Sequence, residues 1–212
     1  MKIFIYIYYF FRSAALRGFA NATKLIRAES HNEKKYGINT SSIKKSDSDE
    51  FFHYQGASYI VLYRIFELVT PRTKFFDFVD IGCGKGRPVF VAESYGYDKL
   101  TGVELDKELV EAANKNLNSY ALKRKASTIE FINANALEYN YKNTPTVYFL
   151  FNPFNAEVLK KVLARISLQT KAETWFVYMN PKYKAAFTED KFEILHEIKT
   201  KRYLEAMVYR LK

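Results

Sequence analysis

The sequence contains little of the residue types that mark disulfide-rich or metal-binding proteins. Of its 212 residues, one is cysteine and three are histidine. A single cysteine excludes an intramolecular disulfide, and with it a disulfide-stabilised secreted scaffold. His31, His53 and His196 have no spacing typical of a metal site or of a partner for a catalytic thiol. We therefore expect no metal and a cytoplasmic protein.

A hydrophobic run long enough to cross a membrane is also missing near the N-terminus. The apolar run Ile3–Phe11 has nine residues, which is too short to span a bilayer. Arg12 and Arg17 separate it from Ala20-Asn21-Ala22, which disfavours a secretory signal. Apolar residues at 4, 8, 11, 15, 19, 22 and 26 instead predict an amphipathic helix. Peripheral membrane contact through residues 1–28 is conceivable, but packing of this helix on the domain is favoured.

Basic residues outnumber acidic ones, 33 against 23, and give a formal net charge of +10. Such a balance suits an acidic partner such as nucleic acid or an anionic surface. Lysines scattered over solvated faces explain it equally well, because no block of five basic residues occurs. The charge by itself therefore selects no partner.

The most informative stretch is 75–105. An apolar, β-rich run, Phe75–Ile81, ends in the glycine loop Gly82-Cys83-Gly84-Lys85-Gly86. Pro88 fits the first turn of a helix over Val89–Tyr95, and Leu100–Glu104 follows as a second strand. A βαβ unit with a glycine-rich first turn and an acid ending its second strand is typical of nucleoside binding.

The spacing within this stretch indicates which nucleoside. Arg87 stands where a dinucleotide fingerprint needs its third glycine, so a pyrophosphate is not indicated. Asp80 lies two residues before Gly82, and Glu104 lies 22 residues after it (104 − 82). VDIGCGKG followed by GVELD resembles motif I and the next acidic motif of class I S-adenosylmethionine (SAM)-dependent methyltransferases. The resemblance implies SAM as cofactor and S-adenosylhomocysteine (SAH) as product.

The remaining pattern predicts a three-layer, Rossmann-like α/β fold. Its sheet would be seven-stranded and mostly parallel, with a C-terminal antiparallel hairpin. We expect a loop or lid over Glu29–His53, helices over Tyr54–Thr70 (ended by Pro71), Asp106–Asn118 and Ala156–Ile166, strands over Ser127–Ile132, Thr146–Phe151 and Thr174–Met179, and a hairpin of Phe192–Ile198 with Tyr203–Arg210. Residues 1–70 would form a helical extension and lid, and residues 71–212 the cofactor-binding domain.

In such sheets the ligand lies at the carboxyl ends of the strands. Asp80 is expected near the methionine part of SAM, where it could attract the ammonium group or cap the glycine loop. Glu104 could accept from the two ribose hydroxyls. Asn135 stands where the family usually has an acid that accepts from the adenine amino group, and Asn133 competes for that role. The expected cofactor-binding set is Asp80, Gly82, Cys83, Gly84, Gly86, Glu104, Asn135 and Ala136.

The fourth strand should end beside the transferred methyl group, at Phe151-Asn152-Pro153-Phe154. This resembles the N-P-P-[YF] motif of amino-group methyltransferases with one proline missing, and also the strand end of Rossmann-type histone-lysine methyltransferases. Asn152 and the Pro153 carbonyl could accept hydrogen bonds from an acceptor nitrogen, and Phe154 could stack on a base or enclose an alkyl amine. Alternatively, Asn152 caps the helix that starts near Asn155.

The sequence also resembles a group of uncharacterised bacterial class I methyltransferases that have GCGKGR, GVELD and FNPF motifs. The segments that carry this resemblance are 33–41, 53–59, 78–87, 102–106 and 149–154. The resemblance covers about positions 30–180. It implies that Tyr54 and Gln55 lie over the cofactor or bind the acceptor, and that Arg87 is buried near the site. The residues themselves allow Arg87 to pair with Asp80 or Glu104.

Two functions from different classes follow. The first is a SAM-dependent methyltransferase acting on a nitrogen of a protein side chain or a nucleic-acid base. The second is a noncatalytic SAM-binding module that binds RNA or another partner. Asp80, the loop glycines, Glu104 and Asn152 favour the enzyme, whereas Asn135 and the shortened N-P-F motif leave the second open.

Overall fold

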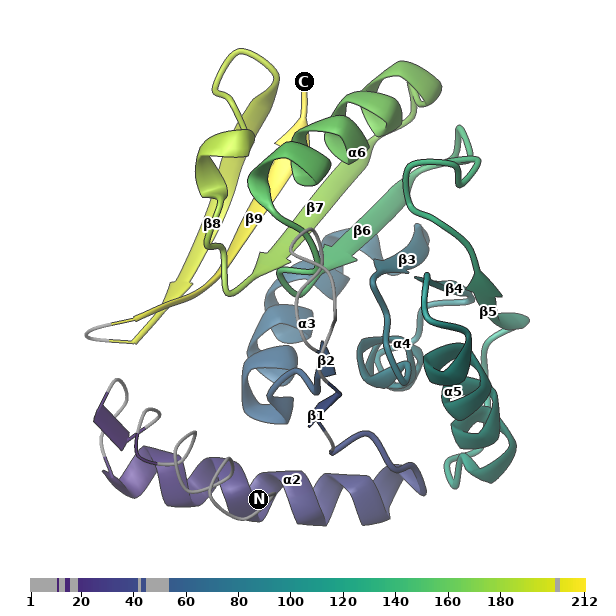
Figure 1. Ribbon diagram of the computed structural model, residues 1–212, viewed down its shortest axis with the longest axis vertical. Coiled ribbons are helices and arrows are strands. Elements are labelled where there is room, and N and C mark those ends of the chain that lie inside the picture. Colours follow the sequence, from purple (N-terminus) through teal and green to yellow (C-terminus); the bar gives the residue numbers. More distant parts are fainter. Residues whose placement is uncertain (1–10, 12–13, 16–18, 42, 45–53, 201–202) are drawn as a thin grey trace.

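The computed structural model describes residues 11, 14–15, 19–41, 43–44, 54–200 and 203–212. Its centre is a seven-stranded sheet in the order β5-β4-β3-β6-β7-β9-β8 (Figure 1). The first five of these run parallel, and β9 is antiparallel to both β7 and β8. The strands are β3 (Asp77–Ile81), β4 (Lys99–Glu104), β5 (Thr128–Asn133), β6 (Thr146–Leu150), β7 (Thr174–Met179), β8 (Phe192–Lys199) and β9 (Leu204–Leu211). The predicted Rossmann-like fold is confirmed.

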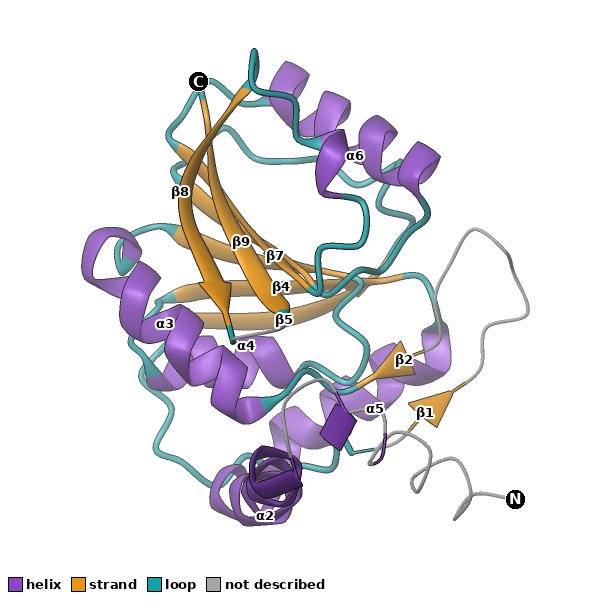
Figure 2. Cartoon of the chain, turned by 90° about the vertical axis from the view of Figure 1, so that its left-hand side faces the viewer, coloured by secondary structure: helices purple, strands orange, loops and turns teal. Residues whose placement is uncertain are grey.

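Helices cover both faces of the sheet. Helix α6 (Ala156–Gln169) lies on one face, and α3 (Tyr59–Thr73), α4 (Arg87–Ser94) and α5 (Lys107–Ser119) lie on the other (Figure 2). Helix α2 (Phe19–Tyr36) lies beyond α3, α4 and α5, farther from the sheet. Two short strands, β1 (Ile43–Lys44) and β2 (Tyr54–Gln55), form a separate antiparallel pair.

The core has two apolar clusters, one on each face. The cluster under α3 and α4 is rich in aromatic rings, with Phe66, Phe78 and Tyr97 packed at centroid distances of 5.4–6.1 Å. The cluster under α6 includes Phe176 and Tyr209. Burial of both sheet faces explains why the parallel strands read as continuous apolar runs in the sequence.

The prediction of a loop over Glu29–His53 is wrong for its first part, because α2 continues to Tyr36. Tyr36 is fully buried and stacks on Tyr59 with ring centroids 5.8 Å apart. The helix ends at Gly37, whose φ of +67° is typical of a C-terminal glycine. The apolar run at 3–11 (except Phe11), most of the helix predicted before residue 19, and the acidic stretch 47–50 with His53 lie outside the described residues.

The predicted helix over Tyr54–Thr70 differs at both ends. Tyr54 belongs to β2, and α3 starts at Tyr59. Pro71 lies inside the last turn instead of ending the helix. A proline removes one helical hydrogen bond, and here the next residues keep the turn closed. Thr73 Oγ1 donates to Val69 O and Lys74 N donates to Thr70 O, both at 3.0 Å.

Helix starts confirm one expected cap and replace another. Asp106 caps α5 by accepting from the backbone N–H groups of Glu108 and Leu109. Asn155, and not Asn152, caps α6 by accepting from Val158 N at 3.0 Å. Asn152 therefore does not cap this helix.

Within the described part of the chain, no helix combines the length and apolarity needed to cross a bilayer.

Candidate functional site

The carboxyl ends of β3, β4 and β5 are joined by hydrogen bonds at one edge of the sheet. The loop amides of Gly82 and Cys83 both donate to Val103 O, at 2.8 and 3.1 Å. Ala134 N and Asn133 Nδ2 both donate to Glu104 O. The parallel register thus brings the predicted glycine loop, Glu104 and the third strand end together.

The glycine loop is closely covered. Gly84 has a φ of +54°, and a Cβ added there would lie 2.2 Å from the ring of Tyr54. Gly82 has a φ of +75°, and its added Cβ would lie 2.5 Å from Pro153 Cβ. Both positions therefore need glycine for backbone conformation and for contact. The loop is in contact with the fourth strand end and with β2.

Glu104 ties this loop to the start of α5. Its Oε2 accepts from Gly84 N at 2.9 Å, and its Oε1 accepts from Asp106 N at 3.0 Å. Burial raises the pKa of the Glu104 carboxyl above its ordinary value, although these backbone bonds oppose the shift. Each carboxylate oxygen still has a lone pair for a further donor.

Asp80 is 1% exposed, and its Oδ2 is buried without a hydrogen-bond partner among the described residues. Capping of the glycine loop by Asp80 is not observed, because the first three loop amides donate to Val103 and Glu104. Burial, reinforced by the charge of Glu104, raises the pKa of Asp80 well above its ordinary value. A cation placed beside Asp80 would relieve this unfavourable burial.

Cys83 is 4% exposed, and burial raises the pKa of its thiol well above the ordinary value. Its sulfur would lie 2.7 Å from a Cβ added at Gly102. Cys83 and Gly102 therefore pack closely, which leaves no room for a larger side chain at position 83. The protonated thiol of Cys83 is also a poor nucleophile.

The third strand end is occupied by its own turn. Asn135 Oδ1 accepts from Leu137 N at 2.9 Å, and Ala136 O accepts from the Tyr141 hydroxyl at 2.7 Å. Asn133 is exposed, and its amide nitrogen donates to the carbonyls of Glu104 and Leu105. Asn133 therefore joins two strand ends, and Asn135 keeps one lone pair of its amide oxygen available.

Asn152 is held in an unusual conformation at the end of β6. It has a φ of +48° and is 8% exposed. Tyr178 donates its hydroxyl to Asn152 Oδ1 at 2.8 Å and accepts from Tyr183 N at 3.3 Å. Since the hydroxyl has a single proton, this pair of bonds orients the Asn152 amide. Pro153 is half-buried against Gly82, and Phe154 is 5% exposed in the apolar cluster under α6.

A second Asn-Pro turn, Asn180-Pro181, follows the neighbouring strand β7 and was not anticipated. Asn180 also has a positive φ, +50°, and its Oδ1 accepts from the Tyr203 hydroxyl. The repeat of the dipeptide after two consecutive strands was the available signal. The edge beside the glycine loop is thus built from two similar turns.

The ring of Tyr54 packs on Gly84 of the glycine loop, and Gln55 is exposed. The contacts with cofactor or acceptor that the resemblance implies for both residues stay predictions. Arg87 is buried, at 2% exposure, as the resemblance implied, but the pairing with Asp80 or Glu104 that its position allowed is not made. Its guanidinium pairs with Glu29 at 2.6 Å and Glu33 at 3.2 Å, both on α2. The two carboxylates lie one helical turn apart and belong to the segment that the sequence pattern indicated as a loop. Among the described residues, no cluster of His, Cys, Asp and Glu could hold a metal ion.

Comparison with known proteins shows a family and a shared fold. The family described as "Conserved hypothetical protein 95" matches residues 59–211. No curated protein matches the sequence. Magnesium protoporphyrin IX methyltransferase from Synechocystis PCC 6803, solved with bound SAM, has a TM-score of 0.57 and 12% identity over 72% of this chain and 79% of its own.

Two further solved structures are similar. A putative methylase from Haemophilus influenzae has a TM-score of 0.55 and 23% identity, over 72% of this chain and 96% of its own. A ribosomal protein L11 methylase from Lactobacillus delbrueckii subsp. bulgaricus has a TM-score of 0.52 and 18% identity, over 72% of this chain and 78% of its own. At these identities the similarity shows a common fold.

Proposed function

Because this chain belongs to the family described as "Conserved hypothetical protein 95", and its Rossmann-like fold is shared with methyltransferases, we propose that it is a SAM-dependent methyltransferase. The methyl acceptor is a nitrogen of a protein side chain or of a nucleic-acid base, and SAH is the product. The observation that carries the proposal is the buried Asp80 carboxyl group next to the glycine loop, whose Oδ2 has no hydrogen-bond partner among the described residues.

The residues present fit the cofactor. A buried carboxylate without a neighbouring cation is unfavourable. The ammonium group of the methionine part of SAM would supply the positive charge that neutralises Asp80. Gly82 and Gly84 both have a positive φ and pack against Pro153 and Tyr54, so glycine lets the loop adopt a backbone conformation that places its end beside Asp80 and Glu104. Glu104 would accept from the ribose hydroxyls with its remaining lone pairs, and Asn135 from the adenine amino group. Cys83, Gly86 and Ala136 complete the proposed set.

SAM supplies a methyl group on a positively charged sulfur, which a nitrogen lone pair can displace. The task of the chain is to orient that nitrogen. Asn152, through the remaining lone pair of Oδ1, and the Pro153 carbonyl would accept its hydrogens. Phe154, buried beneath them, would hold the turn. Tyr54 and Gln55, which precede α3, would also contact the acceptor. Correct positioning can account for about 7–11 kcal/mol of a reaction barrier.

The Tyr178 hydroxyl supports this assignment. It orients Asn152 through a 2.8 Å bond and is itself held by Tyr183 N, so the acceptor site is organised before substrate binds. Tyr178→Phe removes the hydroxyl without changing the ring. We expect methyl transfer to fall about tenfold or more, since small displacements of a reacting group are costly, while the dissociation constant for SAH stays unchanged.

Binding of SAM and SAH by calorimetry is the first test. Two hydrogen bonds to a carboxylate contribute about 1.5–3 kcal/mol each, so Glu104→Ala should weaken both ligands by about 100-fold or more. Because Glu104 also binds two backbone amides, melting temperatures are measured in parallel. The matched control is Glu157→Ala, which changes an exposed glutamate paired with Lys161. If the unaltered protein binds neither ligand, the methyltransferase proposal is refuted.

The second test measures transfer of a tritium-labelled methyl group from SAM, with ribosomal RNA or a protein extract as acceptor. Asn152→Ala should abolish transfer and leave SAH binding intact. An RNA acceptor predicts a steep loss of binding with salt, whereas a lysine acceptor predicts a rate that rises with pH as the amine deprotonates. SAH binding without transfer to either class would favour the noncatalytic, SAM-binding alternative.

A further inference from the structure

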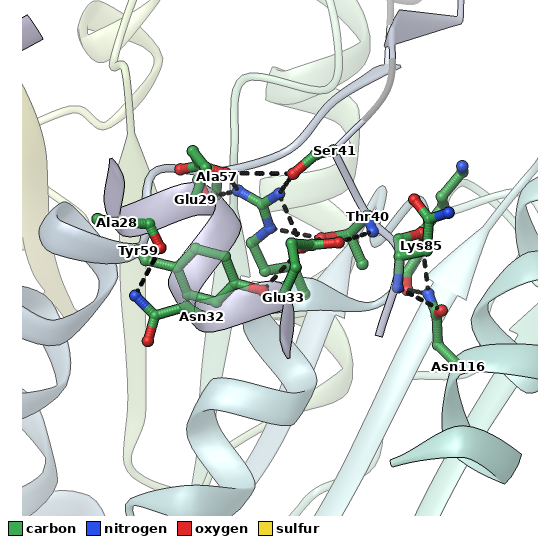
Figure 3. A network of polar contacts seen from close by, with 12 residues as sticks. Ala28, Glu29, Asn32, Glu33, Thr40, Ser41, Ala57, Tyr59, Lys85 and Asn116 are labelled. Carbon is green, nitrogen blue, oxygen red and sulfur yellow. Dashed lines mark hydrogen bonds and ion pairs between the residues drawn. The ribbon is translucent and has the colours of Figure 1, made fainter. Parts of the chain in front are cut away.

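Arg87 follows the glycine loop directly and begins α4, with its guanidinium buried. All five of its N–H donors have acceptors in the structure (Figure 3). The acceptors are Thr40 Oγ1 (2.6 Å), Glu29 Oε2 (2.6 Å), Ala57 O (2.6 Å), Ser41 Oγ (3.0 Å) and Glu33 Oε1 (3.2 Å). The ring of Tyr59 lies 4.4 Å from the guanidinium carbon. We call Arg87 and its five acceptor residues the Arg87 cluster.

The five acceptors share one property: all belong to residues 29–57, which precede the part of the chain that matches the family, 59–211. Glu33 is the centre of this segment. Its carboxylate also accepts from Thr40 N, from Thr40 Oγ1 and from the Tyr59 hydroxyl. The Arg87 cluster therefore joins the N-terminal extension to the first turn after the glycine loop.

A second connection lies on the other side of the loop. Asn116 on α5 accepts from Asn39 N at 2.9 Å and donates to Lys85 O, within the loop, at 3.0 Å (Figure 3). Residues 39–41 are thus held to Arg87 at the start of α4 and, through Asn116 of α5, to Lys85 of the loop. Two separate attachments restrict rotation of the extension about either one.

This arrangement holds Tyr54 against the glycine loop. Its hydroxyl donates to Thr40 O at 2.7 Å, next to the Thr40 hydroxyl that accepts from Arg87. Its ring rests on Gly84, whose amide donates to Glu104. A continuous chain of contacts therefore runs from the Arg87 guanidinium through Thr40 and Tyr54 to the glycine loop, where the methionine part of SAM is proposed to bind.

Only arginine can make this set of bonds. A lysine has three donors on a single nitrogen and cannot reach five acceptors in a planar fork. Gly56 also packs against the face of the group, because a Cβ there would lie 2.6 Å from the guanidinium carbon. The cluster is therefore specific for Arg87 in both its hydrogen bonds and its shape.

We propose that Arg87 is a positioning residue for the amino-acid end of the cofactor: by holding residues 29–41 and, through them, residues 54–57, it keeps the ring of Tyr54 on Gly84, and these residues form one wall of that part of the site. The inference rests on the proposed function. It assigns the extension a direct part in cofactor binding, although the residues that match the family begin only at 59.

The test compares two ligands that differ only at the amino-acid end. SAH has the methionine-derived amino and carboxyl groups, whereas 5′-deoxy-5′-methylthioadenosine keeps the adenosine and the thioether and lacks them. In calorimetry, Arg87→Lys should weaken the binding of SAH about tenfold or more and the binding of methylthioadenosine by less than about threefold. The matched control is Arg210→Lys, since Arg210 pairs with Glu193 at an exposed site and should affect neither ligand.

Hydrogen exchange gives a second readout. SAH should protect the amides of residues 54–59 in the unaltered protein and protect them much less in Arg87→Lys. If Arg87→Lys does not fold, Tyr54→Leu answers the same question, because it removes the ring from Gly84 and leaves the Arg87 cluster intact. It should show the same selective loss of SAH binding.

The inference is overturned if SAH binding is unchanged in the folded variant, or if both ligands weaken equally, as a general structural defect would produce. Failure of the unaltered protein to bind SAH is a different result, because it refutes the proposed function itself.

Discussion

Replacing Gly84 by alanine adds one methyl group at the point where Tyr54 meets the glycine loop. A residue with a side chain costs roughly 1–2 kcal/mol in the left-handed region, and Gly84 has a φ of +54°. The new Cβ would also lie 2.2 Å from a ring carbon of Tyr54, and overpacking of this kind costs about 1–3 kcal/mol. We expect Gly84→Ala to lower the free energy of unfolding by about 2–5 kcal/mol.

Two controls separate the conformational and steric costs. Gly96 has a φ of +98°, and no atom of the described residues lies within 4 Å of an added Cβ, so Gly96→Ala should show the conformational cost alone, about 1–2 kcal/mol. In a Tyr54→Ala background the steric cost of Gly84→Ala disappears, which predicts a coupling energy of about 1–3 kcal/mol.

Urea unfolding of the four proteins in the cycle, which are the unaltered protein, the two single variants and the double variant, measures this coupling. Melting temperatures provide a check, at about 2–4 °C per kcal/mol for a protein of this size. An equal penalty for Gly84→Ala with and without the Tyr54 ring would refute the contact on which the further inference depends.

The other predictions concern two buried acidic side chains, Asp80 and Glu93. Because the pKa of Asp80 is raised by burial and by Glu104, SAM affinity should rise with pH as Asp80 ionises through that raised pKa, and Asp80→Asn should bind weakly with a flat pH profile in calorimetry. The same raised pKa means that the ligand-free protein loses unfolding free energy as pH increases from the ordinary carboxyl range through the pKa of Asp80; Asp80→Asn should remove that slope in urea titrations. Glu93 is 2% exposed and accepts from Lys125 N, Ala126 N and the Tyr120 hydroxyl, so Glu93→Ala should cost about 3 kcal/mol by leaving buried donors without acceptors. Glu93→Gln should cost less than about 1.5 kcal/mol in the same assay, because its amide still accepts from the backbone and donates to the tyrosine; equal losses would contradict this assignment.

The sheet and most helices could be predicted because their signals are local. Apolar runs mark the buried parallel strands, and Asp106 ends a strand-to-helix loop as a typical cap. The glycine loop and Glu104 were predicted to meet because parallel strands end at the same edge, and the bond between Gly84 N and Glu104 confirms this. Their proposed ligand contacts stay predictions.

The parts that were missed depend on partners far along the chain. Glu29 and Glu33 look like solvated charges of a loop, but both pair with Arg87, more than 50 residues later, from the inner face of a helix. The role of Asn152 depends likewise on Tyr178 in the neighbouring strand. A proline such as Pro71 predicts a helix end from its own chemistry, yet the Thr73 and Lys74 bonds, made after it, keep the turn closed.

The single cysteine gives the protein a built-in probe of its own motion. Cys83 lies inside the glycine loop at 4% exposure, so a thiol reagent can reach its sulfur only when the loop opens. Because the chain has no other cysteine, every labelled molecule reports the same event. With excess reagent, the labelling rate relative to that of an unprotected thiol gives the equilibrium constant for opening. Ligands that close the site can therefore be ranked by how much they slow this reaction, without knowledge of the methyl acceptor.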